Sequence, residues 1–219
     1  MKTSEKITWL LFAIVVVAVY LFALDLPLLG PDEPRYSQVA REMFERGDWI
    51  TTTLGGFNWF EKPALLYWLQ ISFYKLFGVS EFSARLGSAL FGLGTIGSMF
   101  LLGKSVTAGS RRTDDTGRDH VSTEDQNPAL PYWLFLITAS SIGLIAFARG
   151  ASFDIILTFP VTASLVSFFV YDHSPKTTSV KSYMPLIAFY VFIGIALIGK
   201  GLVGIVFPFA IVAFYYLLR

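Results

Sequence analysis

The sequence contains no cysteine among its 219 residues and only two histidines, His120 and His173. The absence of cysteine excludes a disulfide framework and thiol-based metal or redox sites. Both histidines fall in polar segments, which argues against a histidine-based metal centre. Charged residues are scarce at 15%, and the net charge is only +1 with no basic block. Nucleic-acid binding needs a concentrated positive surface, so this function class is excluded as well.

Apolar residues, by contrast, make up 54% of the chain, against about 45–50% in soluble domains. They gather in uninterrupted runs, and a helix that crosses a membrane needs about 20 such residues. Six runs approach this length without an ionisable residue, at 7–24, 86–102, 131–148, 155–171, 183–199 and 201–218. The sequence therefore predicts an all-α, polytopic transmembrane helix bundle of about six spans.

A seventh apolar stretch, 63–77, is short and contains Gln70 and Lys75. On a helix its leucines and phenylalanines share one face, whereas Tyr67, Gln70, Tyr74 and Lys75 lie opposite. This pattern favours a helix that lies in the membrane interface over one that crosses the bilayer. A second interfacial helix is expected to run from Pro34, as the first helical residue, to Arg46, with Gly47 closing it.

With both of these helices at the interface, residues 25–85 form one external loop and both chain ends are cytoplasmic. Nine of the 17 Lys and Arg residues then lie inside, which agrees only modestly with the positive-inside rule. The polar segment 104–128 is rich in Thr, Ser and Gly and is expected to be a flexible cytoplasmic linker.

Two adjacent acids, Asp32 and Glu33, lie in the first part of the external loop. Acids are common at the start of a helix, so one interpretation is that one of them is the N-cap. The other is that they belong to an active site just above the bilayer, with one acting as general base. The sequence alone leaves both open.

Further charges punctuate the ends of the apolar runs. Glu61 and Lys62 precede the second interfacial helix and form either a solvated ion pair or, through Lys62, a site for a lipid phosphate. Arg149 and Asp154 lie between the third and fourth spans, and Lys200 lies between the fifth and sixth. Ionisable groups between spans are expensive and are often functional, but Arg149 can also reach headgroups and Asp154 can pair with Lys200 structurally. All of these charges are expected on the external side.

Together these residues resemble the GT-C membrane glycosyltransferases of the aminoarabinose transferase and protein O-mannosyltransferase superfamily. The motifs are Pro31-Asp32-Glu33-Pro34-Arg35-Tyr36, Gly47-Asp48-Trp49, Phe60-Glu61-Lys62-Pro63, Phe82-Ser83-Ala84-Arg85, Arg149 with Asp154, and Gly199-Lys200-Gly201. Because family members are usually more than twice as long, the resemblance implies a truncated chain that holds only the N-terminal transmembrane module, residues 1–219, and that can be inactive alone.

The resemblance implies transfer of a sugar from a polyprenyl-phosphate donor to a lipid A-like lipid or a protein, at the periplasmic face of the cell inner membrane. It assigns catalytic carboxylates to Asp32, Glu33 and Asp154, and a tentative metal position, for a divalent ion, to Glu61. It assigns donor-phosphate binding to a set of cations, Lys62, Arg149, Lys200, Arg35 and Arg85. The alternative that stays open is a non-catalytic transporter or assembly subunit on the same scaffold, although the spans contain few polar groups to line a path.

Overall fold

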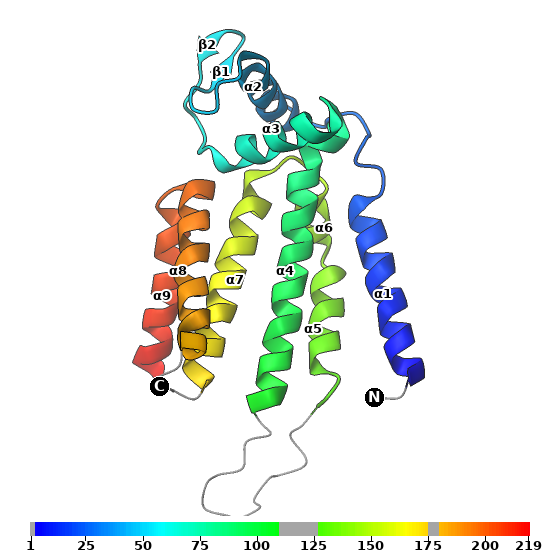
Figure 1. The fold of residues 1–219 in the computed structure, drawn as a ribbon, viewed down its shortest axis with the longest axis vertical. Helices are drawn as coiled ribbons and strands as arrows, with labels where there is room; N and C mark the ends of the chain where they lie inside the picture. The colour runs from blue at the N-terminus through cyan, green and yellow to red at the C-terminus, as the bar shows by residue number, and fades with distance from the viewer. Residues whose placement is uncertain (1–2, 110–126, 175–179) are drawn as a thin grey trace, which may run out of the picture.

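The fold is that of a computed structural model, which describes residues 3–109, 127–174 and 180–219. Figure 1 shows a bundle of helices that run roughly along one direction, with a smaller cap, residues 32–77, at one end. The elements are α1 (Thr3–Leu21), α2 (Asp32–Arg46), β1 (Thr53–Leu54), β2 (Phe57–Asn58), α3 (Leu65–Phe77), α4 (Glu81–Gly109), α5 (Leu130–Ala139), α6 (Ile142–Ala148), α7 (Phe153–His173), α8 (Val180–Lys200) and α9 (Val203–Leu218).

The chain is a multi-span membrane protein, as the hydrophobic runs predict. Within the described ranges, α1, α4, α7 and α8 are each long and apolar enough to cross a membrane. The third predicted span is not one continuous helix, because α5 and α6 meet at a bend of 61°. The sixth run forms the shorter apolar helix α9, which has 16 residues.

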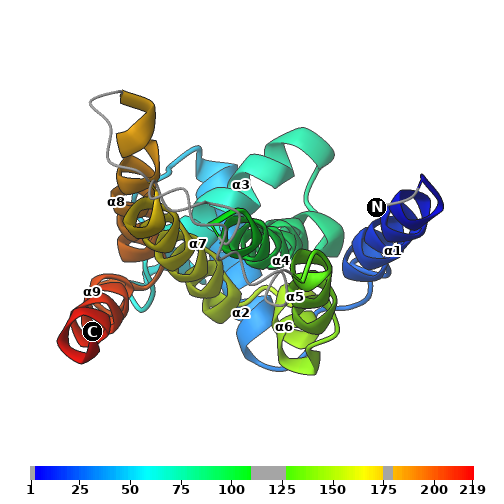
Figure 2. The ribbon, with the colours of Figure 1, turned by 90° about the horizontal axis from the view of Figure 1, so that it is seen from below.

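Helices α4 and α7 occupy the centre of the bundle, whereas α1 and α9 lie at opposite edges (Figure 2). Small residues let neighbouring helices approach closely. A side-chain carbon added at Gly204 would lie 2.4 Å from the backbone of Ala196, so α9 packs directly on the backbone of α8. Such close contacts are a usual source of helix association in membranes, where dispersion replaces the hydrophobic effect.

The segments expected to share one side of the membrane do lie at one end of the bundle. The cap, the α6–α7 connection and the α8–α9 connection are together at the upper end in Figure 1, and the start of α1 and the end of α9 are at the lower end. The topology therefore gathers the predicted site segments.

Helix α2 confirms most of the local prediction and corrects its start. It ends at Gly47, which adopts a left-handed conformation with φ 66°, as a glycine can without steric cost. It begins at Asp32 with Pro31 as N-cap and no capping side chain. The prediction that Asp32 or Glu33 caps the helix, with Pro34 as its first residue, is wrong.

Helix α3 lies across the end of α4, and its buried side includes most of the predicted polar face. Tyr67, Gln70 and Tyr74 are buried against the rest of the cap, whereas Leu76 and Phe77 are 69% and 60% exposed. Of the predicted apolar face, only this C-terminal end is exposed: Leu66 is fully buried, and Leu65 and Leu69 pack against the core. The expectation that the apolar face as a whole turns away from the protein is therefore wrong, and the buried tyrosines and Gln70 help to build the interior of the cap.

The predicted linker begins later than the composition suggests. Helix α4 continues to Gly109, so the expectation of a flexible segment is wrong for residues 104–109. The polar residues of most of the rest of that segment, including His120, lie outside the described residues.

Candidate active site

A cavity of about 900 Å³ lies where the cap meets the bundle. Its walls come from the α1–α2 connection, the starts of α2, α4 and α7, the turn before α3, α6, the α6–α7 connection and the end of α8. Its charged lining residues are Asp32, Glu33, Lys62, Arg85, Arg149, Asp154 and Lys200. The structure thus places all of the predicted site residues on this cavity except Arg35 and Glu61.

Asp154 is positioned by the start of α7. The extended residue Ser152 caps this helix, and its hydroxyl oxygen accepts a hydrogen bond from the backbone N–H of Asp154 at 3.1 Å. The Asp154 carboxylate then accepts a hydrogen bond from the Lys200 ammonium at the end of α8. The two side chains are 53% and 39% exposed, so this ion pair is open to the cavity.

The other half of the site is a chain of alternating charges between α2 and the turn before α3. Arg35 Nη1 lies 3.4 Å from Asp32 Oδ1 and 3.8 Å from Glu61 Oε2, and Lys62 Nζ lies 3.2 Å from Glu61 Oε1. The hydrogen bond to Glu61 raises the pKa of Lys62 above its usual value. Lys62 therefore stays cationic at neutral pH. Arg35 and Glu61, although outside the cavity wall, hold the two lining residues Asp32 and Lys62.

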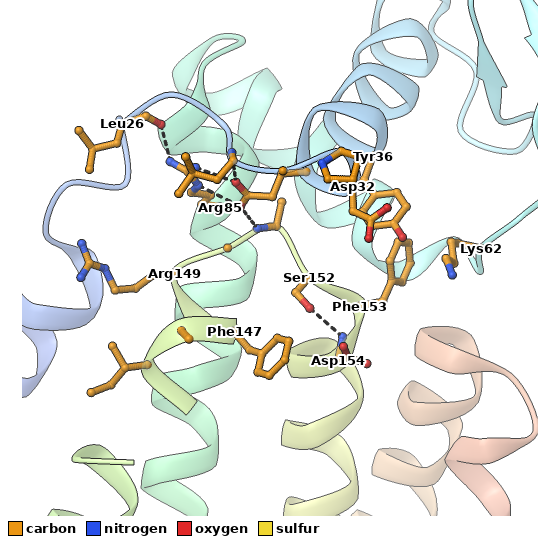
Figure 3. Close-up of a pocket in the computed structure, with 18 of the residues that line it drawn as sticks. Leu26, Asp32, Tyr36, Lys62, Arg85, Phe147, Arg149, Ser152, Phe153 and Asp154 are labelled. Carbon is orange, nitrogen blue, oxygen red and sulfur yellow. Dashed lines mark hydrogen bonds and ion pairs between the residues drawn. The ribbon is translucent and has the colours of Figure 1, made fainter. Parts of the chain in front are cut away.

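Three aromatic rings connect these halves. Phe153 packs edge to face against Tyr36 and Tyr67, with ring centroids 4.9 Å and 5.6 Å apart. Figure 3 shows Tyr36 and Phe153 beside Asp32 at the cavity. Burial raises the pKa of the Tyr36 hydroxyl, so the phenol stays neutral. This residue lines the cavity as a neutral polar group.

Glu33 and Arg85 are bound differently from the other charged residues. Their side chains are 13% and 4% exposed, and Arg85 Nη2 donates to Glu33 Oε2 at 2.8 Å. Burial raises the pKa of Glu33, but hydrogen bonds from Arg85 and from the backbone N–H groups of Leu29 and Ala151 outweigh it and hold the pKa below its usual range.

Arg149 also turns toward the backbone. Its Nη2 donates to the carbonyl oxygen of Phe22 at 3.0 Å, and Figure 3 places it on the opposite side of the cavity from Lys62. The structure therefore does not bring Arg149 close to Lys62, although both line the same space.

The residues near Glu61 do not fit a metal ion. Among residues 3–109, 127–174 and 180–219, no three His, Asp or Glu side chains are grouped to hold one. The nearest charged partners of Glu61 are two cations, Arg35 and Lys62, which compete with a metal for its oxygens. The tentative metal position at Glu61 has no support in this geometry.

Sequence reasoning missed the groups that hold the site together. Ser152 was not predicted, although a serine before an apolar run is a common helix-start signal. The backbone N–H of Ala151, which donates to Glu33 Oε1 at 2.6 Å, carries no signal in the sequence because any non-proline residue supplies such a donor.

Comparison with known proteins identifies the family of the chain. A family model described as dolichyl-phosphate-mannose-protein mannosyltransferase matches residues 6–111 and 123–219. A protein of Shewanella sediminis named undecaprenyl phosphate-alpha-4-amino-4-deoxy-L-arabinose arabinosyl transferase is 30% identical over 197 residues, which are 90% of this chain and 32% of the relative. A protein of Proteus mirabilis with the same name and the number 1 is 30% identical over 94% of this chain and 34% of its own length.

Solved structures give the same result. The apo crystal structure of ArnT from Cupriavidus metallidurans matches 99% of this chain and 36% of that protein, with a TM-score of 0.77 and 28% identity. ArnT bound to undecaprenyl phosphate matches all of this chain and 36% of that protein, with a TM-score of 0.70. The chain spans about a third of the length of the curated relatives that it matches.

Proposed function

Because this chain belongs to the dolichyl-phosphate-mannose-protein mannosyltransferase family and to the GT-C glycosyltransferases, we propose that its cavity binds a polyprenyl-phosphate sugar and takes part in transferring that sugar. Residues 25–85 form the external loop in this proposal, and the cavity faces the periplasm from the cell inner membrane. The names of the relatives, and the ArnT structure with its bound lipid, support undecaprenyl phosphate as the carrier.

One observation carries the proposal. Two carboxylates and two ammonium groups from four separate segments, Asp32, Lys62, Asp154 and Lys200, surround one cavity. Its volume of about 900 Å³ lies within the range of about 300–1,000 Å³ that is usual for small-ligand sites. The arrangement suits a ligand that carries both a phosphate and a sugar.

The cations match the charge that the reaction develops. When the bond between the sugar C1 and the phosphate oxygen breaks, its electron pair stays on the oxygen, and the leaving phosphate gains negative charge. Cations aimed at that oxygen lower the barrier, because they stabilise the transition state more than the ground state. Lys62 and Lys200 are the candidates, since both line the cavity and each has only one described carboxylate partner.

The carboxylates have roles that depend on the acceptor. The acceptor oxygen forms the new bond to C1, and if it is a hydroxyl its proton must go to a base. Asp32 suits that role, since its side chain is 62% exposed and it has one described ion-pair partner, Arg35 at 3.4 Å. If the acceptor is a phosphate of a lipid A-like lipid, no proton leaves, and Asp32 instead orients the sugar. A protein hydroxyl is the other candidate acceptor.

The transporter alternative finds little support in the described spans. The buried hydroxyls of Thr95, Ser98 and Ser164 donate to carbonyls of their own helices. The hydrogen-bonding capacity of these hydroxyls is satisfied within their own helices, so they do not form a polar path along the bundle. An enzyme with its chemistry at one end of the bundle agrees better with this distribution.

A binding and transfer measurement tests the proposal on the chain in lipid nanodiscs. We expect Lys62→Ala to weaken undecaprenyl phosphate binding about tenfold or more, since a hydrogen bond to a charged group contributes about 1.5–3 kcal/mol. The matched control is Lys75→Ala, which removes an exposed lysine from α3.

Asp32→Asn should keep the binding and stop sugar transfer. Transfer is measured by mass analysis of lipids from cells that carry the wild-type gene, the Asp32→Asn gene or neither. Equal affinity of Lys62→Ala and wild type would contradict the phosphate assignment, and movement of the sugar lipid across the bilayer without transfer would favour the transporter.

A further inference from the structure

The carboxylate of Glu33 joins three parts of the site. One oxygen accepts from the backbone N–H of Leu29 at 2.7 Å and from Arg85 Nη2 at 2.8 Å. The other accepts from the backbone N–H of Ala151 at 2.6 Å and from Arg85 Nε at 3.2 Å. Through these bonds the carboxylate joins α2 to the α1–α2 connection, to α4 and to the α6–α7 connection.

Arg85 also binds the carbonyl groups of the α1–α2 connection. Its Nη1 donates to the carbonyl oxygens of Leu24, at 3.1 Å, and of Leu26. Its Nη2 donates to the carbonyl oxygen of Pro27 at 3.0 Å. Figure 3 shows Arg85 between the α1–α2 connection and the α6–α7 connection. One buried ion pair thus ties together three regions that are distant in the sequence: residues 24–33, Arg85 on α4 and the α6–α7 connection.

This bonding leaves Glu33 and Arg85 little capacity for a ligand. Their side chains are 13% and 4% exposed, and each nitrogen of the guanidinium already donates to at least one oxygen. A guanidinium has five N–H groups, and the five contacts of Arg85 match that number. The expected roles of Glu33 in catalysis and of Arg85 in phosphate binding therefore have no free atoms to perform them.

The junction is nevertheless next to the reacting groups. Glu33 follows Asp32 directly in the chain, and Ala151 lies between Arg149 and Asp154. The hydrogen bond from Ala151 to Glu33 therefore links the first turn of α2, which carries one candidate acid, to the connection that leads to the other. Fixing this link fixes the distance across the cavity between the two acids.

We propose that Glu33 and Arg85 are positioning residues that set the separation of Asp32 and Asp154, an inference that rests on the proposed function. Among the contacts of the described residues, neither side chain reaches Lys62 or Glu61. Loss of the junction therefore lowers turnover and spares the affinity for the phosphate. A merely structural ion pair would instead lower the yield of folded protein and leave the turnover of the folded fraction unchanged.

The geometric half of the proposal can be measured without activity. Because the chain has no cysteine, spin labels can be attached cleanly to Gln38→Cys on α2 and Thr158→Cys on α7, two exposed positions. We expect a narrow distance distribution in the otherwise unchanged chain and a broader one with Glu33→Gln or Arg85→Lys. The control Glu45→Gln breaks an exposed pair on α2, Arg41–Glu45, and should leave the distribution unchanged. A distribution unaffected by both junction variants would overturn the proposal.

The kinetic half separates turnover from binding. We expect Glu33→Gln to lower the turnover of sugar transfer about 100-fold, since a displacement of about 1 Å at a reacting group costs about that much. Its affinity for undecaprenyl phosphate should stay close to that of the wild type. An equal loss of turnover and affinity, or no loss of turnover, would overturn the inference. A wild-type chain that binds no undecaprenyl phosphate would end the proposed function instead, and the distance measurement would still decide whether the junction sets the geometry.

Discussion

The cavity contains two ion pairs whose surroundings differ sharply. The buried pair, Glu33–Arg85, is 13% and 4% exposed and also binds five backbone groups. The open pair, Asp154–Lys200, is 53% and 39% exposed, and each partner has the other as its described ionic contact. Both pairs line the same cavity.

This difference distinguishes charged groups that hold the site together from charged groups that are free to act on a ligand. A buried charge is costly unless every donor and acceptor is satisfied, so the protein supplies partners for all of Glu33 and Arg85. A half-exposed pair is solvated and weak, and its atoms can exchange partners with little cost. The degree to which the protein satisfies a charged group thus indicates whether that group holds the site or acts in it.

Removing the cation from each pair is the strongest way to break this comparison. We expect Arg85→Ala to destabilise the chain by about 3 kcal/mol, the low end for a broken buried pair, because Glu33 keeps its two backbone donors. Lys200→Ala should cost less than about 1 kcal/mol, as is usual for an exposed pair. Chemical unfolding in detergent, followed by tryptophan fluorescence, measures both values.

The order of the two losses is the informative result. Destabilisation of the same size in both variants would mean that exposure does not separate the two pairs. Arg41→Ala, which breaks the exposed Arg41–Glu45 pair, controls for the general effect of losing an arginine and should leave stability unchanged.

A third carboxylate extends the comparison to acid pH. Glu42 accepts hydrogen bonds from Thr53 Oγ1 at 2.6 Å and from the backbone N–H groups of Gly55 and Gly56 at 2.8 Å and 3.3 Å. Burial raises the pKa of Glu42, but these bonds and one from Gln38 outweigh it and lower the pKa to about 2. Like Glu33, it is a carboxylate that the protein satisfies.

The lowered pKa fixes the direction of the pH effect. The folded state holds Glu42 ionised below the pKa of the unfolded chain, so its contribution is present above about pH 4.5 and is lost as the pH falls toward 2. We expect wild type to lose about 1.5 kcal/mol more than Glu42→Gln between pH 6 and pH 2.5, the size of one hydrogen bond to a charged group. Unfolding curves at each pH measure this, and parallel losses in the two proteins would contradict it.

The sequence predicts best what depends on composition and local order. The apolar runs give the spans because a helix must cover the bilayer thickness, and their alternation returns Asp32, Lys62, Asp154 and Lys200 to one end of the bundle. Gly47 ends α2 as predicted because few other residues adopt its left-handed backbone at low cost.

The sequence does not show which groups each charged or polar side chain binds. Acids at a helix start suggest capping, but Glu33 binds Arg85, 52 positions away, and Ala151, 118 positions away. The polar face of α3 was assigned by period alone, and only the packing of the cap shows that Tyr67 and Gln70 are its interior. The sequence also does not predict the break between α5 and α6, because the two residues at the break, Ser140 and Ser141, are tolerated within helices.

That break and the interior of the cap offer the finest test of whether satisfied groups stabilise. The Tyr20 hydroxyl donates to the carbonyl oxygen of Ala139 at 3.2 Å, next to the bend between α5 and α6. The Tyr67 hydroxyl is buried without a hydrogen-bond partner among the described residues. We expect Tyr20→Phe to cost about 0.6 kcal/mol, the average for such bonds in membrane helices, and Tyr67→Phe to leave stability equal or higher, because no bond is lost.

Both changes remove one oxygen from a fully buried ring, so the difference between their unfolding free energies isolates the hydrogen bond. A larger loss for Tyr67→Phe than for Tyr20→Phe would show that the unpaired hydroxyl has a partner such as water, and that Tyr67 belongs with the satisfied groups.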